Sequence, residues 1–270
     1  MDQPLHVVIL AAGQGKRMRS PLPKVLQPVA QQPLLAHVIA TARKLEPEAV
    51  HIVYGHGGDQ VQAAFAAQTD LRWALQAEQL GTGHAVQMAL QDVPESAMVL
   101  VLLGDAPLMR SESLRRVLEA AGHGLGVLSA LVADPAGYGR MVRDVDGALE
   151  SIVEHKDAGP DQLAINEVNS GVIAAPADAL RRWLGQVGRD NSQGEVYLTD
   201  CVAIARAEGA SVAATVAEHA EEILGANDRW QLAELERHYQ RRAAAELCAQ
   251  GATVLDPSRV DVRGQVTVDE

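Results

Sequence analysis

The chain has 270 residues, of which 47% are hydrophobic and only 3% aromatic, which suits one large α/β domain with an aliphatic core and an appendage. Its net charge of −12 argues against a surface for nucleic acid or for anionic membranes, because either would favour positive charge. Cys201 and Cys248 lie far apart, and no segment has the pattern of a leader or a membrane span, so we expect a cytoplasmic protein without membrane or nucleic-acid partners.

The first predicted strand, 6–10, runs into a loop of small residues. The strand is apolar throughout, and the loop continues through Gly13 and Gly15. Backbone N–H groups in such a loop can hold phosphates. Cationic side chains gather beside it in an otherwise acidic chain, namely Lys16, Arg17, Arg19 and Lys24. The segment therefore predicts a site for a nucleoside triphosphate.

Two better-known phosphate loops do not fit this segment. A Walker loop needs a serine or threonine after its lysine, and Arg17 stands at that position. A dinucleotide-binding loop needs a third glycine, and Met18 takes its place. Pro21 and Pro23 oppose a helix and are expected to hold the chain extended up to Lys24. A glycine turn with solvated charges is the structural alternative.

Apolar runs alternate with amphipathic stretches along the first half of the chain. We expect further strands over 50–54, 71–75, 98–103 and 126–132, and helices over 34–44, 59–67, 83–90 and 111–121. This alternation predicts a Rossmann-like, mostly parallel, doubly wound α/β sheet. Ligands on such sheets bind beyond the carboxyl ends of the strands, so the polar residues that follow each strand are candidates for a site.

One polar group follows the strand predicted over 71–75. The Gln76 amide has a donor and an acceptor for the imide edge of uracil. Gly81 would let the backbone approach a flat base, and Thr82 is expected to begin a helix as its N-cap. A routine helix cap is the structural alternative for this segment.

A carboxylate follows the strand predicted over 98–103. Gly104 leads directly to Asp105, which falls at the end of the strand. Mg²⁺ is held by few carboxylates together with phosphate oxygens, so Asp105 is a natural metal ligand beside a triphosphate. An aspartate that only caps the next turn is the alternative.

A second polar group lies between residues 137 and 171, in the segments 137–140, 153–157 and 167–171. Glu154, Asn169 and the backbone of Gly139 are groups that bond sugar hydroxyls, and Lys156 could meet a phosphate. Each segment alone is typical of a solvated turn. Their occurrence after consecutive strand signals favours a sugar-binding site.

The last part of the chain changes character. Apolar residues at steps of three and four predict one long helix over 228–250. Asn227 stands where that helix begins and is either its N-cap or a second magnesium ligand through its amide oxygen. Short β-prone pieces follow over 251–270 and look like the opening of a further domain.

These motifs together resemble the sugar-nucleotide pyrophosphorylases. The resemblance rests on Leu10-Ala-Ala-Gly13 with Arg17-Met18 and Leu22-Pro-Lys24, on 76–84, and on Gly137-Tyr-Gly-Arg140, Val153-Glu-His-Lys-Asp157, Glu167-Val-Asn-Ser-Gly171 and Gly194-Glu-Val-Tyr-Leu-Thr-Asp200. Over essentially the whole chain, they look like the bacterial bifunctional N-acetylglucosamine-1-phosphate uridylyltransferase/glucosamine-1-phosphate acetyltransferases.

The resemblance implies a fold of the nucleotide-diphospho-sugar transferase type and a role for each matching residue. Leu10, Ala11, Ala12 and Gly13 would hold the nucleotide through the backbone, with Gln76, Gly81 and Thr82 on the uracil and ribose side. Arg17 and Lys24 would contact the phosphates as catalytic residues, and Asp105 and Asn227 would hold Mg²⁺ and substrate. The remaining substrate-binding positions would be Leu103, Gly104, Gly139, Glu154 and Asn169.

This sequence departs from the family in two ways. Close relatives commonly have tyrosine where this chain has Leu103, which removes any hydroxyl contact but leaves a backbone contact open. The family continues into a left-handed β-helix that carries the acetyltransferase site and forms trimers. We expect a pyrophosphorylase domain over 1–227, a linker helix over 228–250 and the truncated start of that β-helix over 251–270, so neither acetyl transfer nor trimer formation is assigned to this chain.

The implied reaction is uridylyl transfer from UTP to N-acetylglucosamine 1-phosphate, whose product feeds peptidoglycan and lipopolysaccharide synthesis. The phosphate nucleophile is already anionic, so no general base is needed. Catalysis should come from positioning and from positive charge supplied by Mg²⁺, Arg17 and Lys24. The alternatives are a pyrophosphorylase for another nucleotide and sugar phosphate, a dinucleotide-dependent oxidoreductase, and a non-catalytic nucleotide-binding regulator.

Overall fold

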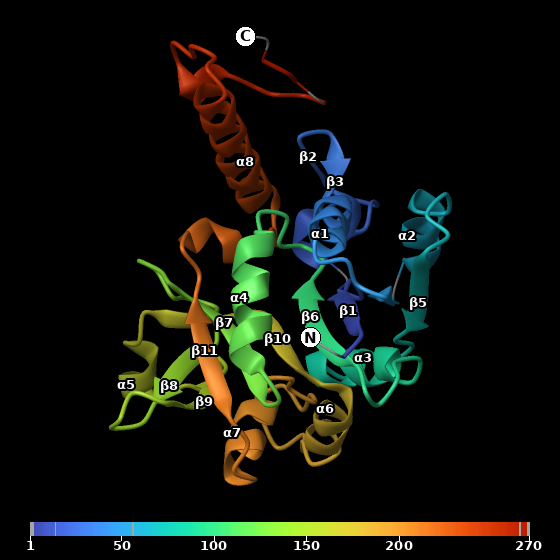
Figure 1. Cartoon of the computed structure of the whole chain (residues 1–270), viewed down its shortest axis with the longest axis vertical. Helices are drawn as coiled ribbons and strands as arrows, with labels where there is room; N and C mark the ends of the chain where they lie inside the picture. Colours follow the sequence, from blue (N-terminus) through green and yellow to red (C-terminus); the bar gives the residue numbers. More distant parts are fainter. Residues whose placement is uncertain (1–2, 14, 56, 265, 269–270) are drawn as a thin grey trace.

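A central sheet forms the middle layer of the molecule in the computed structural model, which describes residues 3–13, 15–55, 57–264 and 266–268 (Figure 1). Its main strands are ordered β11-β7-β10-β6-β1-β4-β5. Their bounds are β1 Leu5–Leu10, β4 Ala49–Tyr54, β5 Leu71–Leu75, β6 Met98–Leu103, β7 Leu125–Leu131, β10 Glu167–Pro176 and β11 Val212–Val216. All five strands expected from the first half of the chain are present.

Most neighbouring strands in this sheet run parallel. The four strands β6, β1, β4 and β5 are mutually parallel, and β11 is parallel to β7. Only β10 runs against its neighbours β6 and β7, and a hairpin of β8 (Arg140–Arg143) and β9 (Leu149–Val153) attaches to it. The predicted Rossmann-like, mostly parallel α/β sheet is confirmed.

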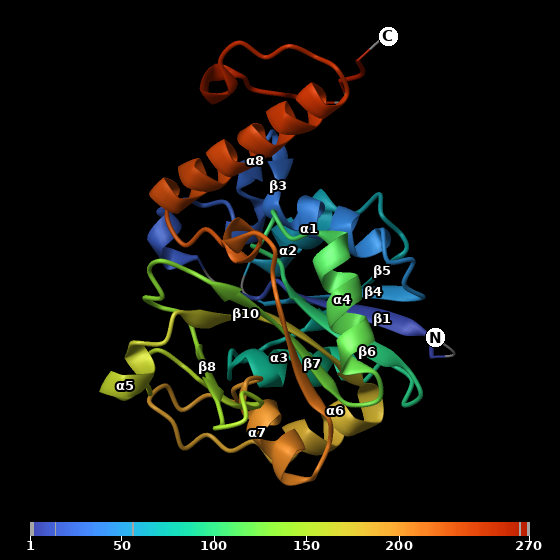
Figure 2. The same cartoon turned by 60° about the vertical axis from the view of Figure 1, so that its left-hand side comes forward.

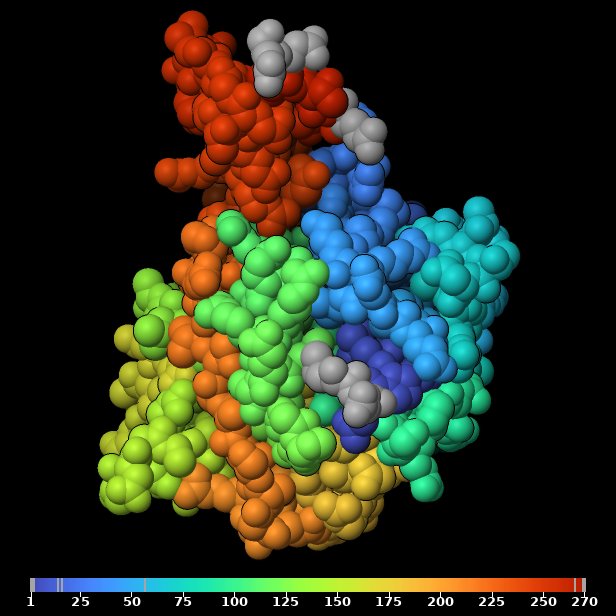
Figure 3. All heavy atoms as spheres, viewed as in Figure 1, coloured from blue at the N-terminus to red at the C-terminus, as the bar shows by residue number. Residues whose placement is uncertain are grey.

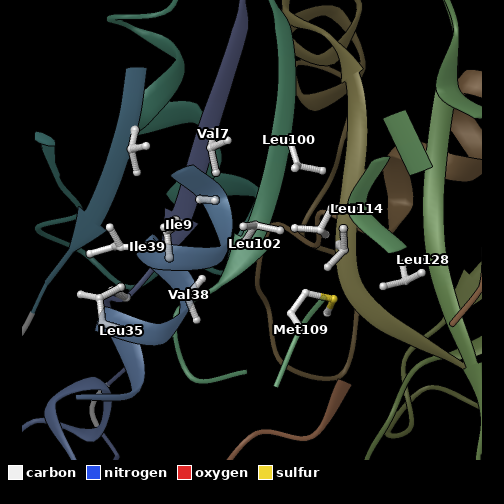
Figure 4. Close-up of a cluster of buried hydrophobic side chains, with 14 of the residues drawn as sticks. Val7, Ile9, Leu35, Val38, Ile39, Leu100, Leu102, Met109, Leu114 and Leu128 are labelled. Atoms are coloured by element: carbon white, nitrogen blue, oxygen red, sulfur yellow. The ribbon is translucent and has the colours of Figure 1, made fainter. Parts of the chain in front are cut away.

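Helices cover both faces of the sheet. One face packs against α1 (Leu34–Arg43), α2 (Gly58–Ala64) and α4 (Ser111–Ala121), and the other against α3 (Thr82–Leu90), α6 (Ala177–Leu184) and α7 (Asp200–Ala207). Alternate residues of a strand point to opposite faces. Val7 and Ile9 of β1 therefore join the first core, shown in Figure 4, and Val8 joins the second. The two layers of helices confirm the doubly wound arrangement.

The register brings the ends of the parallel strands to one edge of the sheet. Leu10 pairs with Leu103 and with Val53, and Tyr54 pairs with Leu75. The residues that follow these strand ends must therefore emerge side by side. Because β10 runs the opposite way, its amino-terminal part, not its carboxyl end, reaches the same edge.

The long helix α8 (Arg229–Ala249) leads away from the sheet (Figure 2). At about 1.5 Å per residue it spans roughly 30 Å. Its first half packs on the body, where Leu235 is buried with Met18, Leu34 and Leu108. The Glu236 carboxylate also accepts a hydrogen bond from the Ala30 N–H, in the turn between β2 (Pro28–Val29) and β3 (Gln32–Pro33). The predicted helix is confirmed, and its first half is docked on the body.

The residues after α8 form a projection at one end of the molecule (Figure 3). Among the described residues from 251 onward, one short 3₁₀ helix, Pro257–Arg259, is the only regular element. The start of a left-handed β-helix there, and the division into three parts, stay predictions. None of the helices that the structure describes is long and apolar enough to cross a membrane.

Candidate functional site

A cleft with a volume of about 610 Å³ opens at this edge of the sheet. All predicted site residues except Gly104 line it: Leu10, Ala11, Ala12, Gly13, Arg17, Lys24, Gln76, Gly81, Thr82, Leu103, Asp105, Gly139, Glu154, Asn169 and Asn227. Residues spread over more than two hundred positions of the chain therefore share one concave site. The amino-terminal glycine loop and Asp105 face the same cleft.

The glycine loop is held tightly against the residues that carry its positive charge. Gly15 has φ +58°, and a Cβ built on it would lie 2.6 Å from Cβ of Lys24. Only glycine lets the loop and Lys24 approach this closely. Pro23 is extended, but residues 20–22 form bends, so the prediction of an extended chain up to Lys24 holds only next to the lysine. Lys24 begins a single 3₁₀ turn, Lys24–Leu26. The side chain of Lys16, one of the predicted cations, lies outside the described part of the chain.

Two of the backbone groups in the segment expected to hold the nucleotide have other partners. The Ala11 N–H donates to the Val53 carbonyl at 2.8 Å, which extends the pairing of β1 with β4. The Ala12 carbonyl accepts from the Gln79 amide. Among the described residues, the N–H groups of Ala12 and Gly13 have no hydrogen-bond partner, so the open amides of the segment 10–13 begin at Ala12.

Lys24 lies at the centre of the charged end of the cleft. Its ammonium forms an ion pair with the Asp105 carboxylate and donates to Asn227 Oδ1 at 3.2 Å. Asp105 follows β6 directly, and a Cβ on Gly225 would lie 2.9 Å from Asp105 Oδ2. The absence of a side chain at residue 225 therefore leaves room for the carboxylate beside Asn227.

The arrangement of Lys24, Asp105 and Asn227 indicates whether a metal ion fits at this point. The Asp105 carboxylate and the Asn227 amide oxygen converge on one cationic group, the Lys24 ammonium, so they can converge on a small cation. Hard oxygen donors of this kind suit Mg²⁺. Within the described ranges, no group of three His, Cys, Asp or Glu side chains is placed to hold a metal. Phosphate oxygens and water would complete the coordination of an ion at this point.

The structure removes the capping alternative for Asn227. The N-cap of α8 is Asp228, whose carboxylate accepts from the Gln231 N–H at 2.9 Å. The Asn227 side chain is therefore free of helix capping and turns into the cleft beside Lys24.

Gln76 is buried and directly follows β5. Its Nε2 donates to the Gly81 carbonyl at 3.0 Å and lies 3.2 Å from Nδ1 of His84. Both amide hydrogens thus have neighbours within the protein. In the described chain the Oε1 atom has no hydrogen-bond partner, so Gln76 offers an acceptor and not the donor–acceptor pair predicted for it.

Thr82 does not act as a helix N-cap, contrary to the prediction. Gly81 is the N-cap of α3, without a side-chain cap, and Thr82 is the first helical residue. The Thr82 hydroxyl instead accepts from the Leu198 N–H at 3.1 Å. Gly81 has φ +110°, and a Cβ there would lie 2.5 Å from the Val196 carbonyl oxygen. Close contact with residues 196–198 therefore accounts for the lack of a side chain at Gly81 and for the hydrogen bond of the Thr82 hydroxyl.

Glu154, Gly139 and Asn169 come together at the other end of the cleft. A Cβ on Gly139 would lie 3.5 Å from Glu154 Oε2 and 3.6 Å from Cβ of Asn169. The Asn169 N–H donates to the Gly139 carbonyl at 2.8 Å. Lys156 lies apart from this group, because its ammonium donates to the Gln193 amide at 2.6 Å and the residue does not line the cleft.

Burial raises the pKa of the Glu154 carboxyl, with smaller contributions from the negative charges of Asp200, Asp157 and Glu195. A hydrogen bond from the Thr199 hydroxyl, 3.1 Å from Glu154 Oε1, acts in the opposite direction. Burial, with a smaller contribution from the negative charge of Asp105, also raises the pKa of the Tyr138 phenol, which lines the cleft. The surroundings of Glu154 are therefore acidic, unlike the cationic end at Lys24.

Leu103 and Gly104 differ in how they contribute. The Leu103 side chain lines the cleft and packs against Gly171, where a Cβ would come within 2.7 Å of it. Gly104 does not line the cleft. Its N–H donates to the Leu10 carbonyl at 2.9 Å, and this bond places Asp105 beside the glycine loop.

Sequence reasoning missed several residues that line the cleft, among them Gln79, Tyr138, Thr199 and Gln231. Gln79 and Thr199 belong to the segments 76–84 and 194–200, which carried the resemblance without being assigned a role of their own. Gln231 supports Asn227, whose N–H donates to Gln231 Oε1 at 2.8 Å. Gln79 and Thr199 thus lie within the sequence motifs, but their contacts depend on tertiary structure.

A comparison with protein-family models finds one match, the MobA-like NTP transferase domain, over residues 7–165. The chain belongs to this family. The matched region contains the glycine loop, Gln76, Asp105, Gly139 and Glu154, so the family's domain includes most of the cleft.

Similar proteins extend the match over nearly the whole chain. The Bifunctional protein GlmU of Stenotrophomonas maltophilia (strain R551-3) is 59% identical over 268 residues, which cover 99% of this chain and 59% of that protein. The proteins of the same name from Xanthomonas euvesicatoria pv. vesicatoria (strain 85-10) and Xanthomonas campestris pv. campestris (strain 8004) give the same identity and coverage. This NTP transferase chain thus spans 59% of the length of these relatives.

Proposed function

We propose that the protein transfers a uridylyl group from UTP to N-acetylglucosamine 1-phosphate, giving UDP-N-acetylglucosamine and pyrophosphate. The observation that carries the proposal is the division of one cleft into two ends. Lys24, Arg17, Asp105 and Asn227 line its cationic end, and Glu154 lies with Asn169 at its acidic end. The 59% identity to proteins named Bifunctional protein GlmU supports the choice of substrates.

The cationic end suits a triphosphate with its metal ion. Mg²⁺, held by Asp105 and Asn227, would neutralise phosphate charge when bound. Lys24 and Arg17 would contact the phosphates, and the open N–H groups of Ala12 and Gly13 would donate hydrogen bonds to a phosphate oxygen. Positive charge placed in advance where negative charge grows lowers the barrier, as in other phosphoryl-transfer sites.

The base and the sugar would occupy the remaining walls. The Gln76 Oε1 atom would accept from the imide N–H of uracil, beside Gly81 and Thr82. Glu154 and Asn169, next to the Gly139 backbone, would bond the amino sugar. This arrangement leaves the sugar phosphate to approach the α-phosphate from the acidic end.

The proposed reaction is a direct transfer between the two bound phosphates. An oxygen of the sugar phosphate forms a bond to the α-phosphorus of UTP, and the bond from that phosphorus to the β-phosphate oxygen breaks. Pyrophosphate leaves toward Lys24 and Arg17, which hold its charge. The attacking oxygen is already anionic, so no residue needs to take a proton. The protein contributes positioning and cationic stabilisation.

The direct test mixes the purified chain with UTP, N-acetylglucosamine 1-phosphate and MgCl₂ and follows UDP-N-acetylglucosamine and pyrophosphate. Parallel reactions replace UTP by ATP, CTP, GTP or dTTP, and the sugar phosphate by glucose 1-phosphate or glucosamine 1-phosphate. We expect turnover with the first pair, lost on addition of EDTA. Equal turnover with another pair would identify a different pyrophosphorylase, and no pyrophosphate with any pair would favour a non-catalytic nucleotide-binding protein.

A further inference from the structure

The segment 191–199 lies between the loop 80–83 and the turn 154–157 and contacts both. It carries most of the motif Gly194-Glu-Val-Tyr-Leu-Thr-Asp200, to which the proposed reaction assigns no part. On one side it pairs with the loop that faces the base: the Val196 N–H donates to the Leu80 carbonyl at 2.7 Å, and the Gly83 N–H donates to the Val196 carbonyl at 2.8 Å. The Leu198 N–H adds the bond to the Thr82 hydroxyl.

On its other side the segment holds the turn 154–157, which carries the sugar-facing carboxylate. The Ser192 N–H donates to Asp157 Oδ1 at 2.9 Å, and the Tyr197 hydroxyl donates to Asp157 Oδ2 at 3.2 Å. The Thr199 hydroxyl donates to Glu154 Oε1 at 3.1 Å. Both ends of this short turn are thus tied to one segment, which is itself tied to the loop 80–83.

The Thr199 hydroxyl does not cap helix α7, although Thr199 stands at the N-cap position of that helix. Thr199 is the N-cap of α7, where a threonine side chain usually accepts from an amide of the first turn. Here Thr199 has helical backbone angles, φ −63° and ψ −27°, and makes no side-chain cap bond. The residue is 5% exposed, and its hydroxyl is directed at Glu154. Helix capping therefore does not account for a threonine at this position.

We propose that Thr199 is a positioning residue for the amino-sugar phosphate, because its hydroxyl holds Glu154 Oε1 and leaves Oε2 beside Gly139 to accept from the sugar. The proposal rests on the proposed function, since it assumes that Glu154 bonds the sugar. Segment 191–199 then ties the sugar-facing carboxylate to the loop 80–83 at the base. Thr199 should affect the sugar phosphate and leave the phosphate chemistry of UTP unchanged.

The test compares Thr199→Val and Thr199→Ser with a matched control, Thr41→Val. Thr41 also donates a hydroxyl hydrogen bond, to the Met109 carbonyl, but it does not line the cleft. Initial rates are measured against each substrate with the other saturating. For Thr199→Val we expect KM for N-acetylglucosamine 1-phosphate to rise by about tenfold, the effect of losing one hydrogen bond to a charged group, with kcat and KM for UTP within about twofold. Thr199→Ser should restore the wild-type KM.

The pH dependence of kcat/KM is a second measurement, which distinguishes a positioning role of Thr199 from a role in packing alone. The bond from Thr199 favours the charged form of Glu154, which faces Asp157, Glu195 and Asp200. Its removal should shift the acid limb of kcat/KM for the sugar phosphate to higher pH. Thr41→Val should not shift it.

The outcomes are distinguishable. An unchanged KM for the sugar phosphate and an unchanged acid limb in Thr199→Val, with a loss of melting temperature matching Thr41→Val, would overturn the positioning role. If Thr199→Val does not fold, Thr199→Ala removes the hydroxyl without adding a methyl branch and is judged by the same two readouts. Failure of the proposed function itself appears in the wild-type protein, as absence of UDP-N-acetylglucosamine.

Discussion

The Lys24 ammonium and the Asp105 carboxylate form an ion pair, so a residue expected to bind phosphate and a residue expected to bind metal neutralise each other. Both side chains are largely buried, and the same ammonium also donates to Asn227 at 3.2 Å. A divalent ion can use the two oxygen donors only if the ammonium moves away from them. The phosphates of a nucleotide offer the ammonium an alternative partner, so nucleotide and metal should favour each other's binding.

Lys24→Met is expected to change metal binding and turnover in opposite directions. Loss of the ammonium frees Asp105 and Asn227, so Mn²⁺ should bind about tenfold more tightly without nucleotide, comparable with one charge-assisted hydrogen bond. Turnover should fall by about 10²-fold or more, because a cation that stabilises the transition state is lost. Electron paramagnetic resonance of free Mn²⁺ and steady-state rates give the two values. Lys44→Met, at an exposed lysine outside the cleft, is the control; equal Mn²⁺ affinity in both variants would exclude competition by Lys24.

Asp105→Asn should weaken the binding of the metal ion that supports the reaction. The substitution keeps the shape of the side chain but removes the charge that attracts a divalent cation. We expect the Mg²⁺ concentration for half-maximal rate to rise by about tenfold or more, the effect of losing a charged ligand. Rates are measured across a Mg²⁺ titration at saturating UTP. Asp59→Asn, on the exposed start of α2, should leave the titration unchanged. A wild-type titration curve for Asp105→Asn would remove this carboxylate from the metal site.

The order of strands and helices could be predicted because it depends on local patterns. The apolar run 98–103 is long enough to identify a buried strand, and it is β6 with the same bounds. Asp105 was found in the same way, because a residue that follows a parallel strand must emerge at the ligand-binding edge. Gln76 was found by the same rule. Where local pattern and topology agree, the sequence is sufficient.

Residues whose placement depends on distant partners could not be predicted. The motif 167–171 predicted Asn169 as a site residue, but not the way it reaches the cleft, because the direction of β10 depends on its pairing with β6 and β7 and not on its own residues. Thr82 looks like a helix cap, but the segment around Leu198, more than a hundred residues away, takes its hydroxyl. Thr199 likewise stands at the N-cap position of a helix, α7, but its hydroxyl donates to Glu154 instead. For both threonines a tertiary hydrogen bond replaces the local one that the sequence favours.

A buried pair of histidines at the other end of the strands should make stability depend on pH. His6 of β1 and His51 of β4 stack with ring centroids 5.3 Å apart, and His6 Nδ1 lies 3.0 Å from His51 Nε2. Burial lowers the pKa of both rings, that of His51 to about 4. A folded state with a lowered histidine pKa binds fewer protons than the unfolded state, so its stabilisation is complete above about pH 6.5 and is lost as the pH falls toward 4.

From the His51 pKa, linkage gives a loss of about 2 kcal/mol in the free energy of unfolding between pH 7 and pH 5. Urea unfolding at the two pH values measures it. His51→Leu should show a clearly smaller difference between them, because that side chain does not titrate. His123→Gln, at an exposed histidine, should keep the wild-type difference. The same difference in His51→Leu as in wild type would mean that other groups cause the acid sensitivity.

Gly81→Ala should disturb the base-facing loop more than the same change at another glycine with positive φ. Gly81 has φ +110°, and a Cβ there would lie 2.5 Å from the Val196 carbonyl oxygen, whereas Gly209 has φ +77° with nothing within 4 Å. Gly209→Ala should therefore cost about 1 kcal/mol of stability through backbone strain alone. Gly81→Ala must also separate the loop 80–83 from residue 196, so we expect a larger loss in urea unfolding and a Kd for UTP about tenfold higher by isothermal titration calorimetry, comparable with losing one well-placed hydrogen bond. Equal stability losses and equal UTP affinities in the two variants would show that contact with Val196 does not shape the base site.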